Sequence, residues 1–153
     1  TKEEILSLMD QGIAINPHYR KITPIVADEL ARWGDWENAV WIWESVVVSR
    51  PHVLALLANV GRGYAQMGHL ERAREYLDRA RAIRPDALAV RSLEVMLLMR
   101  AGQEEQATAL IQSAFRLDRY DMDLLNAAYA LGVRAKDWPM AIEALQRRRN
   151  EVA

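Results

Sequence analysis

A period of 34 residues runs through this chain and constrains its fold more than any other feature. Glycine recurs at this interval at Gly34, Gly68 and Gly102, and alanine and proline follow the same period. The recurring alanines and prolines are Ala39, Ala73, Ala107 and Ala141, and Pro17, Pro51 and Pro85. The segments "DWENA" at 35–39 and "DWPMA" at 137–141 lie three periods apart. A fixed period of this length predicts that one structural unit has been copied along the chain.

Each copied unit has the pattern of two amphipathic helices with the glycine between them. Apolar residues recur three and four apart before the glycine and again after it. We expect the glycine to end the first helix in a left-handed conformation. Asp35 and Asp137 then cap the second helix, and Pro139 lies in its first turn. The recurring alanine lies where the two helices cross, and the proline stops the second helix, a signal that the third unit loses at Arg119.

The pattern predicts nine helices. They lie near 3–15, 19–33, 36–49, 52–67, 70–83, 86–101, 103–117, 121–135 and 138–150. Pro24 is the one local conflict with this pattern. Either Thr23 caps a helix that starts at Pro24, or the proline lies in the first turn of a helix that begins near Tyr19.

The period and its residues resemble the tetratricopeptide repeat (TPR). Residues 54–87 match the pattern of that repeat best. The matching residues are Leu57, Val60, Gly61, Tyr64, Gly68, Ala73, Leu77, Ala80 and Pro85. Residues 20–53 and 88–121 are further repeats, and residues 122–153 form a degenerate terminal repeat. The resemblance implies an all-α fold, a single domain over 1–153 built as a solenoid of helix-turn-helix repeats in a right-handed superhelix.

The first 19 residues have the pattern of the second helix of a preceding repeat. The first helix of that repeat is missing, and the sequence begins at Thr1 rather than at methionine. We therefore expect the chain to be part of a longer protein.

The residue types argue against an enzyme. The chain has no cysteine, so thiol catalysis, disulfides and cysteine metal sites are excluded. His18 and His52 are one repeat apart in the loop after the proline, and His69 follows a turn glycine, so none is placed to bind a metal with another from one helix face. We expect no catalytic residue, no cofactor and no metal.

The composition also limits the partners. A formal net charge of -1 gives no electrostatic footprint for nucleic acid, and no apolar run is long enough to cross a bilayer, so we expect a soluble segment. Arg147, Arg148 and Arg149 fall at the end of the last helix, where cations complement the helix dipole. A phosphate or lipid headgroup is the alternative reason for these three arginines.

Stacked helical pairs bind partners on the face that their first helices line. The resemblance places partner-binding positions on these helices, and the candidates are Arg32, Asn59, Arg62, Met96, Arg100, Asn126 and Arg134. Arginine pairs with carboxylates or phosphates in a bidentate manner, which favours an anionic group on the partner. Of the clamp of chaperone-binding repeats, only one asparagine position is matched, by Asn59. The other positions hold Pro24, Asp28, Ala89 and Leu93. We therefore expect a protein or peptide partner other than a chaperone tail.

A narrower resemblance is carried by "ITPIVADELARWGDWENAVWIWESVVVSRP" at 22–51 and by the segment "NVGRGYAQMGHLERAREYLDRARAIRPDALAVRSLEVMLL" that follows. These segments are similar to the C-terminal repeat domain of bacterial membrane-bound O-antigen polymerase/ligase and protein O-oligosaccharyltransferase-like proteins. The resemblance implies a soluble domain on the periplasmic side of the inner membrane, joined to the membrane only through a parent chain. It also makes a glycan or a lipid-linked sugar a possible ligand, as an alternative to a protein.

Four of the five tryptophans lie between residues 33 and 43. The repeat register places Trp43 at a large core position shared with Leu77, Ile111 and Leu145. It places Trp36 at a core position shared with Leu70 and Trp138. Trp33 and Trp41 fall instead at positions that the repeat leaves at the surface. They are candidates either for packing against further protein or for contact with a ligand or partner.

Overall fold

The computed structural model describes residues 3–4, 7, 11 and 23–152, and these residues form helices and turns without any strand. The helices with defined bounds are α2 (Thr23–Arg32), α3 (Trp36–Ser49), α4 (Leu54–Gln66), α5 (Leu70–Ile83), α6 (Leu88–Arg100), α7 (Glu104–Arg116), α8 (Met122–Arg134) and α9 (Trp138–Val152). These bounds agree with the sequence prediction to within two residues from α3 onward. The predicted helix at 3–15 and the predicted start at Tyr19 lie mostly or entirely outside the described residues.

Four copies of one turn join the first helix of each pair to the second. After α2, the Gly34 amide donates to the Ala31 carbonyl at 3.0 Å, and the Asp35 amide donates to the Leu30 carbonyl at 2.8 Å. The same two bonds recur one, two and three periods later, and φ is +82°, +82° and +77° at Gly34, Gly68 and Gly102. This is the Schellman motif, and it confirms the left-handed glycine predicted from the sequence.

The fourth copy of this turn has no glycine. Lys136 stands at the glycine position with φ +57°, and the same pair of hydrogen bonds closes the turn after α8. The end of α7 is a similar case, because Asp118 adopts φ +54° and the Arg119 amide donates to the Ala114 carbonyl at 2.9 Å. A left-handed Asp118 therefore ends this helix where the proline of the other repeats is replaced by Arg119.

The second helices begin at the predicted caps. The Asp35 carboxylate accepts the Asn38 amide at 3.4 Å, and the Asp137 carboxylate accepts the Met140 amide at 3.3 Å. Pro139 lies in the first turn of α9, where a backbone N–H has no partner within the helix, so the missing N–H of proline costs nothing. These contacts confirm the two predicted caps and fix where α3 and α9 start.

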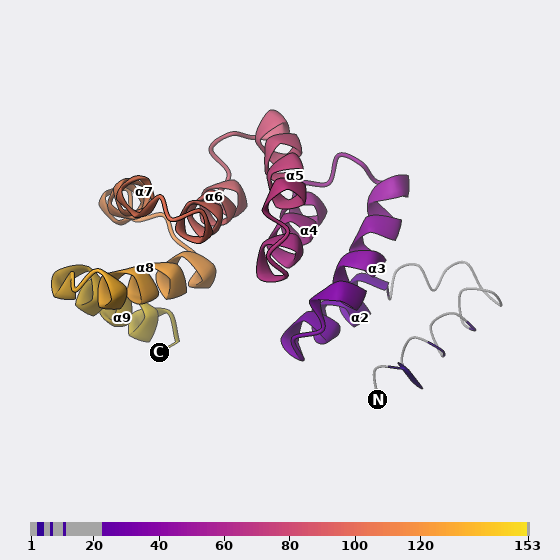
Figure 1. Cartoon of the computed structure of the whole chain (residues 1–153), viewed down its shortest axis with the longest axis horizontal. Coiled ribbons are helices and arrows are strands. Elements are labelled where there is room, and N and C mark those ends of the chain that lie inside the picture. Colours follow the sequence, from indigo (N-terminus) through magenta and orange to yellow (C-terminus); the bar gives the residue numbers. More distant parts are fainter. Residues whose placement is uncertain (1–2, 5–6, 8–10, 12–22, 153) are drawn as a thin grey trace. The chain divides into compact units, whose positions relative to one another are not determined.

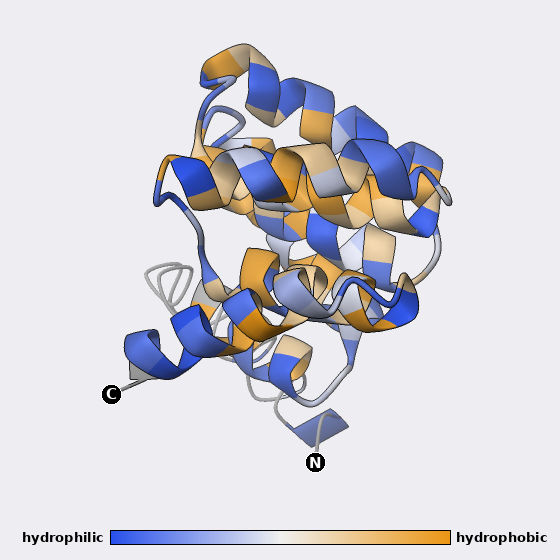
Figure 2. Ribbon diagram, turned by 90° about the vertical axis from the view of Figure 1, so that its left-hand side faces the viewer, coloured by the Kyte–Doolittle hydropathy of each residue, from blue (hydrophilic) through white to orange (hydrophobic). Residues whose placement is uncertain are grey.

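The chain divides into two compact units, Thr1–Arg79 and Ala80–Ala153, with the division inside α5. In the first unit α3 packs against both α2 and α4. In the second unit α6 packs against α7 and α8, and α8 packs against α9. Figure 1 shows α8 and α9 side by side in the second unit. The helices in Figure 2 carry both hydrophilic and hydrophobic residues, as expected of helices with one face in the core.

Small residues let the paired helices approach closely. All four periodic alanines are buried, at 0–3% exposure. A Cβ atom added at Gly132 would lie 2.8 Å from the Ala141 backbone nitrogen, so glycine is required where α8 crosses α9. A Cβ atom added at Gly63 would lie 2.3 Å from the Val40 Cγ2 atom, where α4 crosses α3. The burial of the periodic alanines and the contact of Ala141 with Gly132 agree with the predicted close approach of the paired helices.

Candidate functional site

The first helices of the second unit, α6 and α8, pack against each other and carry exposed or half-buried side chains at the predicted positions. On α8 the exposed residues Asn126, Ala130 and Arg134 are spaced by four, so they share one face of the helix. On the neighbouring α6, Arg100 is exposed and Met96 is half-buried. Arg100 and Arg134 are one repeat apart and therefore occupy equivalent positions on two adjacent helices. We call Met96, Arg100, Asn126, Ala130 and Arg134 the first-helix surface.

The remaining predicted positions belong to the first unit. Asn59 and Arg62 lie on α4 and are half-buried, and Arg32 is exposed at the end of α2. The Arg62 guanidinium lies 5.7 Å from the centroid of the Trp36 ring, in a cation–π contact between α4 and α3. The seven predicted residues therefore fall into two sets, one in each unit.

Two of the predicted arginines already have carboxylate partners. An Arg32 Nη atom lies 2.9 Å from Glu29 Oε1, and an Arg134 Nη atom lies 2.7 Å from Glu104 Oε1. Pairs as exposed as these contribute only about 0–1 kcal/mol to stability. A carboxylate on a partner could therefore replace Glu104 at Arg134 at little cost to the fold.

Trp33 and Trp41 are both exposed in the structure, at 50% and 57%. Trp33 follows the end of α2, and Trp41 is in the middle of α3, on the face that also carries the exposed Val48. Since large apolar side chains usually occupy the core, these two rings remain candidates for contact with another molecule.

The core positions assigned to the other tryptophans are correct only in part. Trp43 is fully buried, and Leu77 and Ile111 at the equivalent positions are at 5% and 0% exposure. Trp36 and Leu70 are half-buried. The core prediction is wrong for Trp138 and Leu145, which are 54% and 44% exposed.

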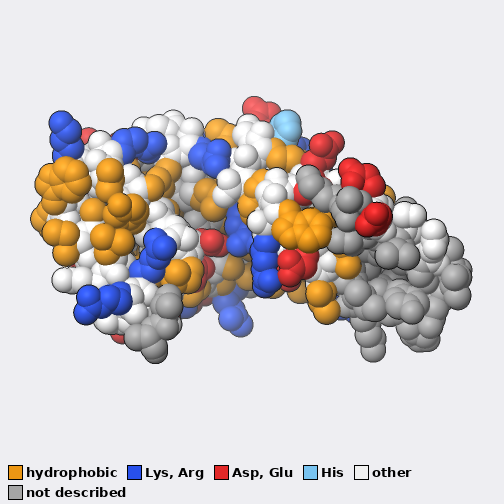
Figure 3. Space-filling model, turned by 90° about the horizontal axis from the view of Figure 1, so that it is seen from below, with side chains coloured by type: hydrophobic (Ala, Val, Ile, Leu, Met, Phe, Trp, Pro, Cys, Tyr) orange, Lys and Arg blue, Asp and Glu red, His pale blue; other side chains and the backbone are white. Residues whose placement is uncertain are grey.

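This error arises because the next helix, α4, covers the equivalent face of α3 in the first unit. Gly63 of α4 lies against Val40, Trp43 and Trp36 of α3. Among the described residues, no helix covers α9 in this way. Trp138 and Leu145 therefore join an apolar patch with Ile142 on α9 and with Tyr129 and Val133 on α8. Figure 3 shows apolar side chains gathered at this end of the second unit, with arginine and lysine side chains around them.

A polar network in the first unit was not predicted from the sequence. The Tyr64 hydroxyl on α4 donates a hydrogen bond to Glu44 Oε1 on α3, and Arg72 on α5 lies 3.5 Å from the same oxygen. The Arg72 guanidinium is also 5.2 Å from the centroid of the Tyr64 ring. Burial and the Glu44 carboxylate raise the pKa of Tyr64 above its usual value. Tyr64 stands at the tyrosine position of the repeat, but Glu44 and Arg72 follow no periodic pattern.

Arg147 forms a second network, inside the second unit. Its guanidinium donates to Asp118 Oδ1 at 2.8 Å, to Glu143 Oε1 at 3.0 Å and to the Phe115 carbonyl at 3.2 Å. It also lies 4.8 Å from the Phe115 ring centroid and 5.0 Å from that of Tyr120. Arg147 thus connects α9 to the turn between α7 and α8. Of the three consecutive arginines at 147–149, Arg148 and Arg149 are exposed and Arg147 is half-buried.

Metal-ligating side chains do not cluster in the described part of the chain. His52 and His69 are exposed in turns, and His18 lies outside the described residues. No three histidine, aspartate or glutamate side chains in the described residues are gathered so that they could hold a metal ion. Of the described helices, none combines the length and the apolar character needed to cross a membrane.

Solved structures with a similar fold include two TPR proteins. A TPR protein from Parabacteroides merdae aligns with a TM-score of 0.77 at 15% identity over 98% of this chain. A thermophilic TPR protein from Thermus thermophilus aligns with a TM-score of 0.73 at 17% identity, covering 95% of this chain and 80% of its own. A double mutant titled MamA RS-1 ArsTM aligns with a TM-score of 0.64 at 20% identity, covering 95% of this chain and 82% of its own.

These alignments confirm the all-α TPR solenoid predicted from the period. The chain spans 59% of the length of the Parabacteroides structure. No protein-family model matches the sequence. A search of curated proteins finds no relative.

Proposed function

We propose that this tetratricopeptide-repeat fold serves as a non-catalytic module that binds an extended peptide segment of a protein partner on the first-helix surface. The observation that carries the proposal is the exposed stripe on α8, Asn126, Ala130 and Arg134, beside the accessible Met96 and Arg100 of α6. Structural neighbours with the TPR fold support an interaction scaffold of this kind.

The chemistry of the surface favours a peptide with an acidic side chain. The Asn126 amide can both donate to and accept from a peptide backbone, and Met96 offers an adaptable apolar contact. Arg100 and Arg134 lie at one end of their helices and can pair with a carboxylate. A peptide that crosses α6 and α8 would meet amide, thioether and guanidinium groups in turn.

A comparison of binding between matched variants tests this proposal. The partner captured by the wild-type chain should be lost or bound at least about tenfold more weakly by the double variant Arg100→Ala, Asn126→Ala, a loss of about 1.4 kcal/mol. The control is Arg148→Ala, Arg149→Ala, which removes two exposed cations from α9 and should bind as the wild type does. Equal binding by the surface variant and the wild type, with both folded by circular dichroism, would rule out this surface.

A second candidate function is direct contact with a glycan or a lipid-linked sugar. The exposure of Trp33 and Trp41 favours it, because a free indole face can stack on the C–H surface of a sugar ring. Titration of the chain with saccharides should then shift the intrinsic tryptophan fluorescence, and the shift should be absent in Trp33→Ala, Trp41→Ala. Saccharides that leave the fluorescence unchanged would eliminate this candidate.

The proposed context is a bacterial membrane-bound glycan polymerase or ligase, with this module on the periplasmic side of the inner membrane. The support is the resemblance of residues 22–51 and of the repeat that follows. The reading frame that encodes the chain tests the context: transmembrane helices upstream of Thr1 are expected, and a complete frame without them would remove it.

A further inference from the structure

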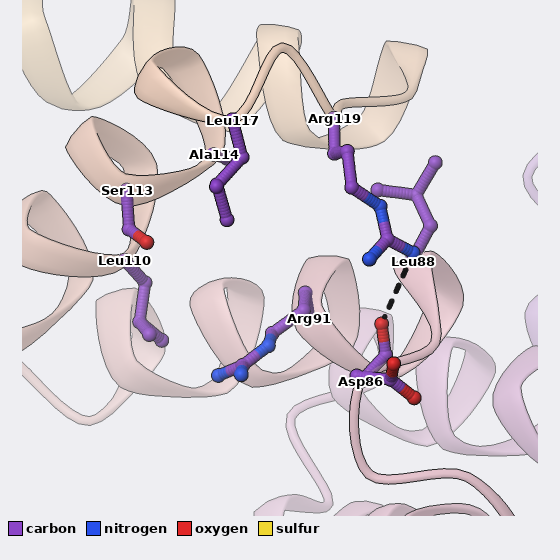
Figure 4. A pocket seen from close by; sticks show the side chains of 8 residues that line it. All are labelled: Asp86, Leu88, Arg91, Leu110, Ser113, Ala114, Leu117 and Arg119. Atoms are coloured by element: carbon purple, nitrogen blue, oxygen red, sulfur yellow. Dashed lines mark hydrogen bonds between the residues drawn. The ribbon is translucent and has the colours of Figure 1, made fainter.

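The second unit contains a cavity of about 130 Å³ between α6, α7 and the turn that follows α7. Its apolar wall is formed by Leu88, Leu110, Ala114 and Leu117, and its polar groups come from Asp86, Arg91, Ser113 and Arg119. Figure 4 shows Leu110, Ser113 and Leu117 on one side, with Arg91 and Arg119 on two others. A cavity of about 150 Å³ admits a benzene-sized molecule, so this one can hold a short hydrocarbon group.

The repeat register explains why the cavity exists. Arg91 stands one period after Leu57, which is 1% exposed and therefore lies in the core of the second repeat. Arg119 stands one period after Pro85. The third repeat therefore has a cation at two positions where the second repeat has an apolar residue. The Arg91 side chain is 49% exposed, so it does not pack in the core as Leu57 does in its own repeat.

The cavity has an excess of positive charge. Arg119 donates a hydrogen bond to the backbone carbonyl of Asp86 at 3.3 Å. Because a carbonyl is neutral, this hydrogen bond does not neutralise the positive charge of the guanidinium. Arg91 lies 3.9 Å from Glu94, at the limit of an ion pair, and Arg81 lies closer to the same carboxylate, at 3.4 Å. Asp86 is the one acidic residue among those that line the cavity. An anion is therefore favoured over a neutral or cationic ligand.

We propose that this cavity binds the carboxylate of a short branched aliphatic acid. The hydrocarbon portion lies against Leu88, Leu110 and Leu117, and the carboxylate is held by Arg119 and by Arg91, with the Ser113 hydroxyl as a further donor. Arg91 is half-exposed and only weakly paired, so its guanidinium can turn toward the ligand. This site is separate from the first-helix surface and does not depend on the proposed peptide binding.

The test uses 4-methylpentanoate as the probe and two-dimensional ¹H–¹⁵N NMR spectra of the whole chain. We expect saturable shifts of the amides of residues 86–91 and 110–119, with a dissociation constant on the order of 1 mM for a ligand of this size. 4-Methylpentanamide has the same shape without the charge, and acetate has the charge without the chain. Each should bind at least about tenfold more weakly.

Two variants and one control identify the residues responsible. Arg91→Leu restores the residue of the second repeat, fills the cavity and should abolish binding. Arg119→Gln removes the second cation and should weaken binding at least about fivefold, even if the first variant fails to fold. Arg116→Gln removes an exposed cation of α7 that does not line the cavity and should bind as the wild type does.

The same chemistry is offered by the C-terminal leucine of a peptide, so acetyl-Gly-Leu is the second probe. Tighter binding of either probe supports the site and identifies the source of the carboxylate. The proposal is overturned if neither probe shifts these amides at about 20-fold the expected dissociation constant. It is also overturned if the amide binds as well as the acid, or if Arg119→Gln binds as the wild type does.

Discussion

Lys136 occupies a backbone conformation that favours glycine, and replacing it should stabilise the protein. Its φ of +57° matches the left-handed turns at the three periodic glycines. An L-residue in this region costs roughly 1–2 kcal/mol, and the greater backbone entropy that glycine loses on folding offsets roughly 0.5–1 kcal/mol of that. Lys136→Gly should therefore raise the free energy of unfolding by about 0.5–1 kcal/mol, because the exposed lysine side chain contributes little.

The reverse change at Gly102 should have the opposite sign. No atom lies within 4 Å of a Cβ atom built at Gly102, so Gly102→Ala introduces no clash and the penalty is purely conformational. We expect a loss of about 0.5–1 kcal/mol. For a chain of this size these changes correspond to shifts in Tm of about 1–4 °C in opposite directions.

Urea unfolding followed by circular dichroism measures both changes, with the slope of the transition checked for constancy. Lys136→Ala is the control, because it removes the charge and keeps an L-residue in the turn. It should change the free energy of unfolding by less than about 0.5 kcal/mol. If Lys136→Gly were no more stable than the wild type, or if the alanine control gave the same gain, the conformational reasoning would be refuted.

Three other experiments test the packing and the charges. Gly63→Ala should destabilise the protein by about 1–3 kcal/mol through its clash with Val40. Adding Val40→Ala should recover part of that loss, and a double-mutant cycle followed by urea unfolding measures the recovery. In the same assay, Trp43→Ala should lower the free energy of unfolding by about 3–5 kcal/mol because its ring is fully buried. Trp41→Ala on the same helix should lower it by less than about 1 kcal/mol because its ring is exposed. Equal losses would contradict the assigned burial. The raised pKa of Tyr64 means that the folded state holds its proton more tightly, so stability is complete below pH about 10 and falls as the pH rises through the pKa of the folded state. Tyr64→Phe should reduce this loss of stability above about pH 10, and an unchanged loss would show that the hydroxyl contributes nothing to it.

The local features of the fold could be predicted because each depends on a few neighbouring residues. The helix bounds, the glycine turns and the caps at Asp35 and Asp137 follow from the period and from capping chemistry. Lys136 shows the limit of residue type as a guide, since the turn keeps its geometry without its glycine. At such a position the packing of the helices on either side fixes the backbone conformation, and the residue adopts the left-handed conformation despite its conformational cost.

Burial and cross-helix contacts were harder to predict because they depend on the next element in space. Trp138 occupies the register position of Trp36, but no described helix follows α9 to cover it. The hydrogen bond from Tyr64 to Glu44 joins two helices through residues that no periodic pattern relates. The predicted binding positions remain predictions, and the carboxylate partner of one of them, Arg134, became visible only in the structure.

Site-specific photo-crosslinking tests the proposed peptide-binding function most directly. A photoreactive amino acid at Asn126, on the first-helix surface, is compared with the same amino acid at Asn150, exposed near the end of α9. For both variants, the protein is expressed in the cells from which it comes. The proposed function predicts one discrete crosslinked partner from position 126, lost on Arg100→Ala, and none of it from position 150. Equal crosslinking at the two positions, or none at position 126, would contradict the proposal that α6 and α8 bind the partner.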